Sequence, residues 1–153
     1  DIKLAGKLEE AKCAGMLTSL DVVRSPRMDT PDVLWPCLPY LDIFMCNEHE
    51  GWRITGHKEL SSIAKELRDR GGSTIIIKLG KEGCWLENDD FAELIPGKRV
   101  DVVDTTGAGD AFAAGLITAL IYGSDVREAC QAGNAAGARI AGSLGTLAGW
   151  GFK

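Results

Sequence analysis

Residues 57–80, HKELSSIAKELRDRGGSTIIIKLG, contain a helix pattern followed at once by a strand pattern. Gly71 and Gly72 end the helix pattern, in which charged side chains fill one face and apolar side chains the other: Leu60, Ile63, Ala64 and Leu67. The segment 73–80 is β-branched with little alternation, which is typical of a strand buried on both faces of a parallel sheet. An amphipathic helix that leads into such a strand favours an α/β fold.

The rest of the chain repeats this alternation of helices and strands. A helix at 2–14 precedes a strand within MLTSLDVV (16–23), and DIFMCN (42–47) predicts a second strand. The later segments predict a hairpin from GCWLEN (83–88) and FAELIP (91–96), then helices at 109–122 and from 126 to about 141, the second capped by Ser124 or Asp125. We therefore expect one α/β domain over residues 1–153, with a mainly parallel sheet and right-handed crossovers.

Three polar or glycine positions fall where predicted strands end. Asn47 follows DIFMCN, Gly80 follows STIIIKL, and Asp104 ends RVDVVD (99–104). Ligands of open α/β sheets bind beyond the carboxyl ends of the strands. These three segments are therefore predicted to meet at one ligand crevice.

Composition restricts the class of protein. The 153 residues are 45% hydrophobic, enough for a core, and the formal net charge is −5 with a pI near 5.0. This acidity, with no basic cluster, argues against nucleic acid and anionic membranes as partners. The longest nearly apolar run, 111–122, is too short to cross a bilayer. Five cysteines without a CxxC pair favour reduced thiols, so we expect a cytoplasmic protein. The absence of a basic cluster leaves a small molecule or another protein as the expected partner.

The segment DTTGAGD (104–110) carries the chemistry. Gly107 and Gly109 permit positive φ or close approach of a ligand, and a helix that begins here directs free N–H groups and its positive dipole end outward. Such a turn holds an anion. Asp110 would repel a phosphate, but it is well placed to accept a proton from an attacking hydroxyl.

Two common phosphate loops are absent from the sequence. GxxxxGK[ST] does not occur, and GxGxxG fails because Phe112 replaces its third glycine. A purely structural alternative remains: the glycines build a tight strand-to-helix turn, and Asp110 is favourable at the helix dipole. A dinucleotide-dependent redox enzyme is disfavoured by the failed glycine spacing.

DTTGAGDAFAAG (104–115) resembles the second signature of the PfkB carbohydrate kinases of the ribokinase-like superfamily. The order of SLD (19–21), NEHE (47–50), IIIKLGKEGCWL (75–86) and GNAAGARIAGSLGT (133–146) agrees with that family. The resemblance implies a ribokinase-like three-layer α/β/α sandwich. It also implies ATP-dependent phosphorylation of a hydroxyl on a sugar or sugar-like molecule.

The resemblance assigns roles to the loop. Asp110 corresponds to the general base, and the amides of Gly107, Ala108 and Gly109 correspond to the anion hole for the transferring phosphoryl group. Asp104 and Thr106 resemble positions that, with main-chain oxygens, bind potassium or a similar monovalent cation. The side chain of Asp104 could equally cap its own turn.

Asn47 and Glu50 match the N-x-x-E pair that helps to hold Mg²⁺ and its waters near the phosphates. The same two residues would also fit a helix cap and its capping-box partner. The positions matching nucleotide contacts are Lys78, Gly80, Gly83, Thr105 and Asn134. Lys78 replaces the more usual threonine, and a simple surface charge is its alternative role, as a plain glycine turn is for Gly80 and Gly83.

The family's amino-terminal lid and its double-glycine signature have no counterpart in these residues. We therefore expect the carboxyl-terminal portion of a kinase: an excised piece, a truncated gene product, or a non-catalytic nucleotide-binding or regulatory module. Without a lid to exclude water and orient the hydroxyl, turnover by these residues alone should be weak or absent. Exposed sheet edges would favour association of copies into a homo-oligomer.

Overall fold

The structure is a computed structural model that describes residues 2–23 and 31–144. The chain divides into two compact units. The first contains residues 1–78 and 85–93, and the second contains residues 79–84 and 94–153. That the two make one domain stays a prediction.

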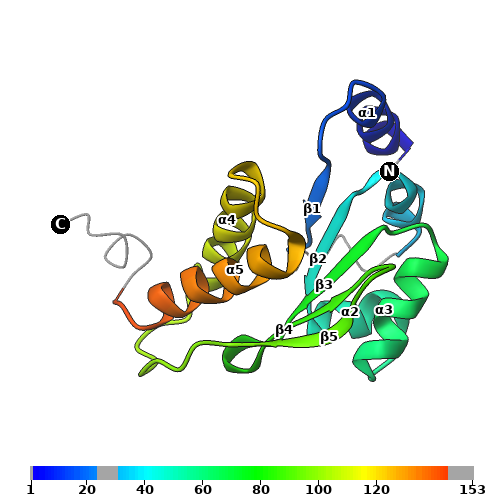
Figure 1. Cartoon of the computed structure of the whole chain (residues 1–153). Helices are drawn as coiled ribbons and strands as arrows, with labels where there is room; N and C mark the ends of the chain where they lie inside the picture. Colours follow the sequence, from blue (N-terminus) through cyan, green and yellow to red (C-terminus); the bar gives the residue numbers. More distant parts are fainter. Residues whose placement is uncertain (1, 24–30, 145–153) are drawn as a thin grey trace. The chain divides into compact units, whose positions relative to one another are not determined.

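Five strands form one sheet in the order β1-β2-β3-β4-β5 (Figure 1). Their bounds are β1 (Ser19–Asp21), β2 (Ile43–Asn47), β3 (Thr74–Lys78), β4 (Gly83–Glu87) and β5 (Ala92–Pro96). The first three are parallel: β1 pairs with β2, and β2 pairs with β3 along its whole length. The mainly parallel sheet is thereby confirmed.

The core of the first unit lies in β2 and β3. Phe44 and Cys46 of β2 and Ile75, Ile76 and Ile77 of β3 are fully buried. Consecutive buried residues require that both faces of the sheet be covered, which is why these strands lack alternation. The predicted strand at 16–23 is shorter than expected, since only three residues pair with β2.

The predicted hairpin forms β4 and β5. Asn88 closes the turn through its backbone N–H, which donates to Phe91 O at 2.8 Å, and through its side chain, which accepts from the N–H groups of Asp90 and Phe91. A connection this short joins adjacent antiparallel strands.

Helices of the first unit are α1 (Ile2–Cys13), α2 (Glu48–Thr55) and α3 (Leu60–Asp69), with 3₁₀ turns η1 (Pro31–Val33) and η2 (Trp35–Tyr40). Helix α3 packs against β3 and α2, and α1 packs against η2. The helix pattern predicted from residue 57 begins three residues later, because α3 starts at Leu60. Its buried side chains are Ile63, Ala64 and Leu67.

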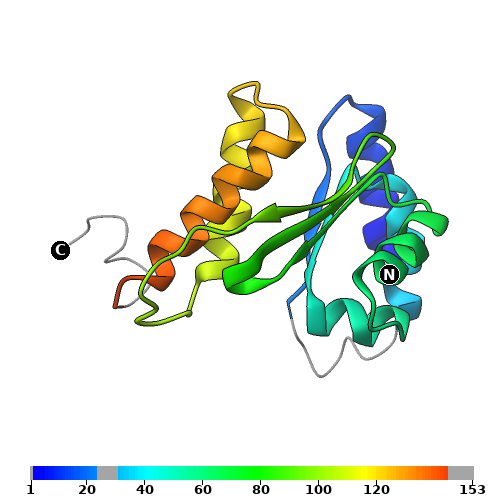
Figure 2. The same cartoon turned by 60° about the horizontal axis from the view of Figure 1, so that its bottom comes forward.

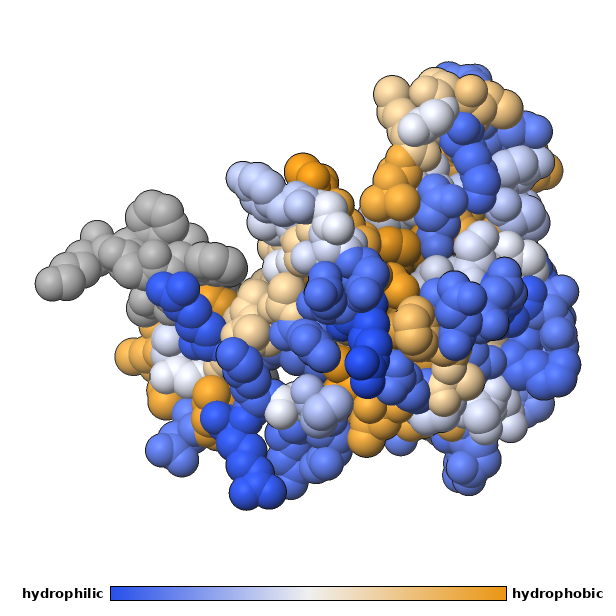
Figure 3. All heavy atoms as spheres, in the orientation of Figure 1, coloured by the Kyte–Doolittle hydropathy of each residue, from blue (hydrophilic) through white to orange (hydrophobic). Residues whose placement is uncertain are grey.

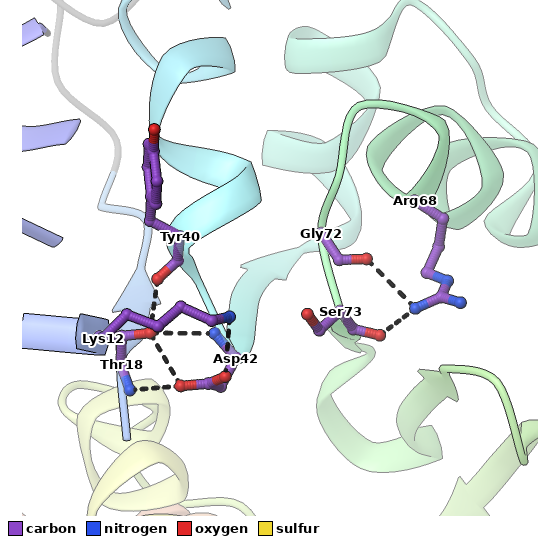
Figure 4. A network of polar contacts seen from close by, with 7 residues as sticks. All are labelled: Lys12, Thr18, Tyr40, Asp42, Arg68, Gly72 and Ser73. Carbon is purple, nitrogen blue, oxygen red and sulfur yellow. Dashed lines mark hydrogen bonds and ion pairs between the residues drawn. The ribbon is translucent and has the colours of Figure 1, made fainter. Parts of the chain in front are cut away.

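A polar cluster joins the start of β2 to the residues that precede β1 (Figure 4). One carboxylate oxygen of Asp42 accepts from the Thr18 N–H at 2.8 Å and from its hydroxyl at 3.0 Å, and the other accepts from Lys12 at 3.0 Å. Thr18 also donates to Tyr40 O at 2.6 Å. Figure 4 shows a second contact, in which Arg68 donates to the carbonyls of Gly72 and Ser73 after α3.

The second unit contains η3 (Gly80–Glu82) and the helices α4 (Ala108–Ile121) and α5 (Val126–Ala141). The two helices lie side by side in both views (Figures 1 and 2). Asp125, rather than Ser124, caps α5, and Glu128 completes a capping box.

The strand expected to end at Asp104 is not formed. Residues 97–104 adopt no strand, and Val102 and Val103 are 58% and 57% exposed. The N–H groups of Val103 and Asp104 donate instead to Ala141 O, at 2.8 and 3.2 Å, at the end of α5. Asp104 therefore begins the turn before α4 without following a strand, because a helix carbonyl takes the donors that a sheet would use.

Candidate functional site

Three polar side chains stand at the carboxyl ends of the parallel strands of the first unit. Asp21 ends β1, Asn47 ends β2 and Lys78 ends β3. The strand register pairs Asn47 directly with Lys78 and pairs Asp21 with Met45. The fold therefore gathers these residues at the sheet edge where α/β proteins bind ligands.

Lys78 forms an ion pair with Asp21. Its ammonium nitrogen lies 2.6 and 2.7 Å from the two carboxylate oxygens, and the side chains are only 15% and 20% exposed. A simple surface charge therefore does not describe Lys78. The sequence pointed to Lys78, and it left Asp21, the last residue of SLD, with no role beyond packing or ordering near the phosphates. An acidic residue at the end of one predicted strand and a basic residue at the end of another could have suggested an ion pair. Only the order of the strands in the sheet shows that the two residues meet.

Asn47 and Glu50 form the predicted capping box of α2. Asn47 Oδ1 accepts from the Glu50 N–H at 2.8 Å, and Glu50 Oε2 accepts from the Asn47 N–H at 2.7 Å. The cap uses one oxygen of each side chain. Glu50 Oε1 remains to bind a hydrated divalent cation, so the pair fits magnesium as well as the helix cap.

Cys46 precedes this cap and is fully buried. Burial, with the nearby Glu50 carboxylate, raises the pKa of its thiol far above the usual range. The thiol is therefore neutral near pH 7.

In the second unit, the segment 104–110 is a structured turn. Asp104 Oδ1 accepts from the Thr106 N–H at 2.9 Å, so the predicted cap of this turn is confirmed. Gly107 has φ +78°, a left-handed conformation that side chains disfavour, and it forms the N-cap of α4. The Ala108 N–H donates to Thr105 O at 3.1 Å.

Three backbone donors at the start of α4 are open. Within residues 2–23 and 31–144, the N–H groups of Gly107, Gly109 and Asp110 make no hydrogen bond. Unpaired N–H groups together with the helix dipole attract an anion. Asp110 is exposed in the first turn of the helix, beside these donors.

Gly80 is the first residue of η3 and Gly83 follows its last residue, with φ +59° and +107°. Gly80 is exposed, with open space where a side chain would stand. Gly83 is buried, and a Cβ atom there would overlap the Ile95 carbonyl oxygen of the facing strand. Gly83 is therefore required by the close approach of β4 and β5, whatever else it binds.

Asn134 of α5 is 7% exposed. Its amide nitrogen donates to Ile95 O at 3.1 Å and Pro96 O at 3.3 Å, and lies 3.8 Å from Cys84 Sγ. These bonds join the helix to the end of β5. The predicted contact between Asn134 and a nucleotide base stays a prediction.

The family model described as "pfkB family carbohydrate kinase" matches residues 7–150. The chain belongs to the pfkB family of carbohydrate kinases. A pfkB relative, the 2-dehydro-3-deoxygluconokinase of Bacillus subtilis, is 43% identical over 98 residues, which make up 63% of this chain and 30% of that protein.

Solved structures agree with this family. Aminoimidazole riboside kinase from Salmonella enterica, complexed with aminoimidazole riboside and an ATP analogue, gives a TM-score of 0.85 at 29% identity over 95% of this chain and 52% of that one. A putative ribokinase II from Escherichia coli, solved in complex with ATP and Mg²⁺, has a TM-score of 0.81 and is 28% identical. The match covers 93% of this chain and 47% of that one. The predicted ribokinase-like α/β fold is confirmed.

The pfkB segment is shorter than its relatives. It spans 30–42% of three curated relatives and about half of the solved chains. It therefore matches part of a pfkB kinase, as the sequence predicts. No helix in the described part of the chain is long and apolar enough to cross a membrane.

Proposed function

We propose that this protein transfers the γ-phosphoryl group of ATP to a hydroxyl of a sugar or sugar-like molecule. The observation that carries the proposal is the start of α4, where open N–H groups lie beside the exposed carboxylate of Asp110. A phosphoryl group in transfer gathers charge on its oxygens, and preorganised N–H donors stabilise that charge. Membership of the pfkB family supports the same reaction.

Asp110 is the proposed general base. Its carboxylate would accept the proton of the acceptor hydroxyl as that oxygen attacks the phosphorus. The N–H groups of Gly107 and Gly109 would bind the phosphoryl oxygens. The Ala108 N–H would join them by sharing the hydrogen bond that it donates to Thr105 O.

The remaining roles rest on residue chemistry. Mg²⁺ would neutralise phosphate charge, with Asn47 and Glu50 holding it through their side-chain oxygens and through waters. Asp104 and Thr106 would contribute to a monovalent-cation site for potassium. Lys78, Gly80, Gly83, Thr105 and Asn134 would contact the nucleotide. Lys78 would have to release or share Asp21 to reach a phosphate.

We infer the class of substrate from the names of the relatives. The B. subtilis relative is a 2-dehydro-3-deoxygluconokinase and the S. enterica neighbour acts on a riboside, so a polyhydroxylated sugar, sugar acid or nucleoside is the proposed acceptor. Such substrates and ATP are cytoplasmic metabolites, and we place the protein there.

The test is calorimetric titration of MgATP into the chain with potassium present, beside an Asp110→Asn variant. We expect both to bind with affinities within about threefold, because Asp110 serves the acceptor and not the nucleotide. With sugars added, turnover should be weak, and the variant should lose it. Failure of both to bind would contradict the proposal. Binding without turnover, also after the rest of a pfkB kinase is supplied in trans, would favour a non-catalytic nucleotide-binding module.

A further inference from the structure

Helix α5 contacts the first turn of α4 through a glycine. A Cβ atom on Gly137 would lie 3.0 Å from Ala108 O and 3.7 Å from Phe112 Cβ. The first of these distances is shorter than an ordinary van der Waals contact, and the neighbour is backbone that cannot rotate away. A side chain at position 137 would therefore push α5 and the start of α4 apart by a few tenths of an ångström.

The same helix holds the residues before the turn. Ala141 O accepts hydrogen bonds from the N–H groups of Val103 and Asp104, at 2.8 and 3.2 Å. Gly137 and Ala141 are four residues apart, so they lie on one face of α5, one turn from each other. The segment 103–108 is therefore held at both ends by a single helix face.

A third contact on this face reaches the hairpin. Asn134, three residues before Gly137, donates to Ile95 O and Pro96 O at the end of β5. One rigid helix thus fixes two segments that the proposed function assigns to the nucleotide: the turn before α4 and the glycine-flanked start of β4 that β5 faces.

We propose that Gly137 is a positioning residue: it sets the distance between α5 and Ala108 that directs the open N–H groups of Gly107, Gly109 and Asp110 toward a bound phosphate. This inference rests on the proposed function for its phosphate, but its geometry lies wholly within the second unit. Misplacing such donors by a fraction of an ångström weakens them strongly, because hydrogen bonds depend steeply on distance and angle.

Other glycines of the same helix pair supply a control. A Cβ on Gly115 of α4 would lie 2.8 Å from Ala136 Cβ and 3.0 Å from Ala132 O. Gly115 is seven residues, two helical turns, beyond Ala108. Alanine at Gly115 should therefore strain the α4–α5 contact as much as alanine at Gly137 does, but far from the turn.

The experiment compares Gly137→Ala with Gly115→Ala in ¹⁵N-labelled protein. We expect Gly137→Ala to shift the amide resonances of Gly107, Gly109 and Asp110 and to speed hydrogen exchange at Val103 and Asp104 at least about tenfold. It should also raise the Kd for MgATP about tenfold. Gly115→Ala should lower stability to a similar extent, measured by urea unfolding, and leave these amides and the Kd unchanged.

Equal effects of the two variants on the turn amides, or no effect of Gly137→Ala on them, would overturn the inference. If the wild-type chain binds no MgATP, the proposed function fails here, while the exchange data still decide the role of Gly137. If Gly137→Ala does not fold, hydrogen exchange of the wild-type protein provides the test. The amides of Val103 and Asp104 should then be protected as strongly as those in the last turn of α5. Fast exchange at these two amides would contradict the inference.

Discussion

The ammonium group of Lys78 lies 2.6 and 2.7 Å from the carboxylate oxygens of Asp21, 57 residues earlier in the chain, although β2 lies between their strands. The pair links the ends of β1 and β3 across the strand that carries Asn47. It is mostly withdrawn from solvent, at 15% and 20% exposure. A charge left behind by removal of either partner would therefore be poorly hydrated.

Asp21→Asn should lower the free energy of unfolding by about 1–3 kcal/mol, because it leaves the Lys78 ammonium without a counter-charge. The double variant Asp21→Asn with Lys78→Met should recover part of this loss, since it removes the unpaired charge. Urea unfolding of the two single variants and the double variant makes a complete cycle. Strict additivity of the two single effects would contradict a coupled pair.

Glu50→Gln should separate the cap of α2 from cation binding. Glutamine still offers an oxygen to the Asn47 N–H, so the capping box and the stability should persist. The variant lacks the negative charge that favours Mg²⁺, and the Mg²⁺-dependent part of ATP affinity should fall about tenfold. Asn47→Ala, by contrast, removes both the cap and a proposed cation ligand, so it should lose about 1 kcal/mol of stability as well as Mg²⁺ dependence. A Glu50→Gln variant with unchanged Mg²⁺ dependence would remove Glu50 from the proposed cation site.

Asp42 should make stability depend on pH. Desolvation alone would raise the pKa of its carboxyl, but hydrogen bonds from Thr18 and Lys12 outweigh it and hold the pKa below the ordinary value. A lowered folded-state pKa stabilises the fold above the unfolded value, about 3.9, and this stabilisation is lost as the pH falls through the folded-state value. Asp42→Asn should therefore cost about 1 kcal/mol at pH 7, with the exposure of the pair taken into account, and less below pH ~4.

Urea midpoints of the wild type and of Asp42→Asn, measured from pH 7 to pH 3, test this dependence. The two curves should converge as the pH falls. A difference between the two urea midpoints that stays constant from pH 7 to pH 3 would show that the charge of the Asp42 carboxylate does not contribute to stability. Lys65→Met is a useful comparison, since its partner Asp69 is exposed on α3 and the loss should be small at every pH.

The first unit should associate with copies of itself. Among the strands of residues 2–23 and 31–144, the edge strand β1 pairs only with β2, and Met16 and Leu17, just before it, are 62% and 58% exposed. Figure 3 shows apolar surface along the segment that leads from α1 into β1. An open edge beside apolar side chains favours pairing with another strand.

Light scattering across a concentration series should show dimers or larger species. Met16→Lys with Leu17→Glu should shift the distribution toward monomer, and Tyr122→Ser, at an exposed position on the other unit, should not. A monomer at every concentration would count against this association.

The sequence by itself determined the local elements and the family. Periodicity located α3 and the buried strands β2 and β3, because helix and strand spacing depend on neighbouring residues alone. The spacing of Asn47 and Glu50 predicted a capping box, and DTTGAGD predicted a helix start with a glycine free to adopt positive φ. These are short-range features, whose hydrogen bonds join residues two to four positions apart.

Only the tertiary structure decided which distant groups meet. The sequence left Lys78 as either a nucleotide contact or a surface charge, and only the order of β1, β2 and β3 brings Asp21 beside it. RVDVVD reads as a strand, yet the Ala141 carbonyl takes its terminal N–H groups. The sequence matches Asn134 to a nucleotide contact, and only the fold supplies Ile95 O and Pro96 O as its hydrogen-bond partners. In each case the partner is tens of residues away, and the packing of whole elements, which no local pattern encodes, selects it.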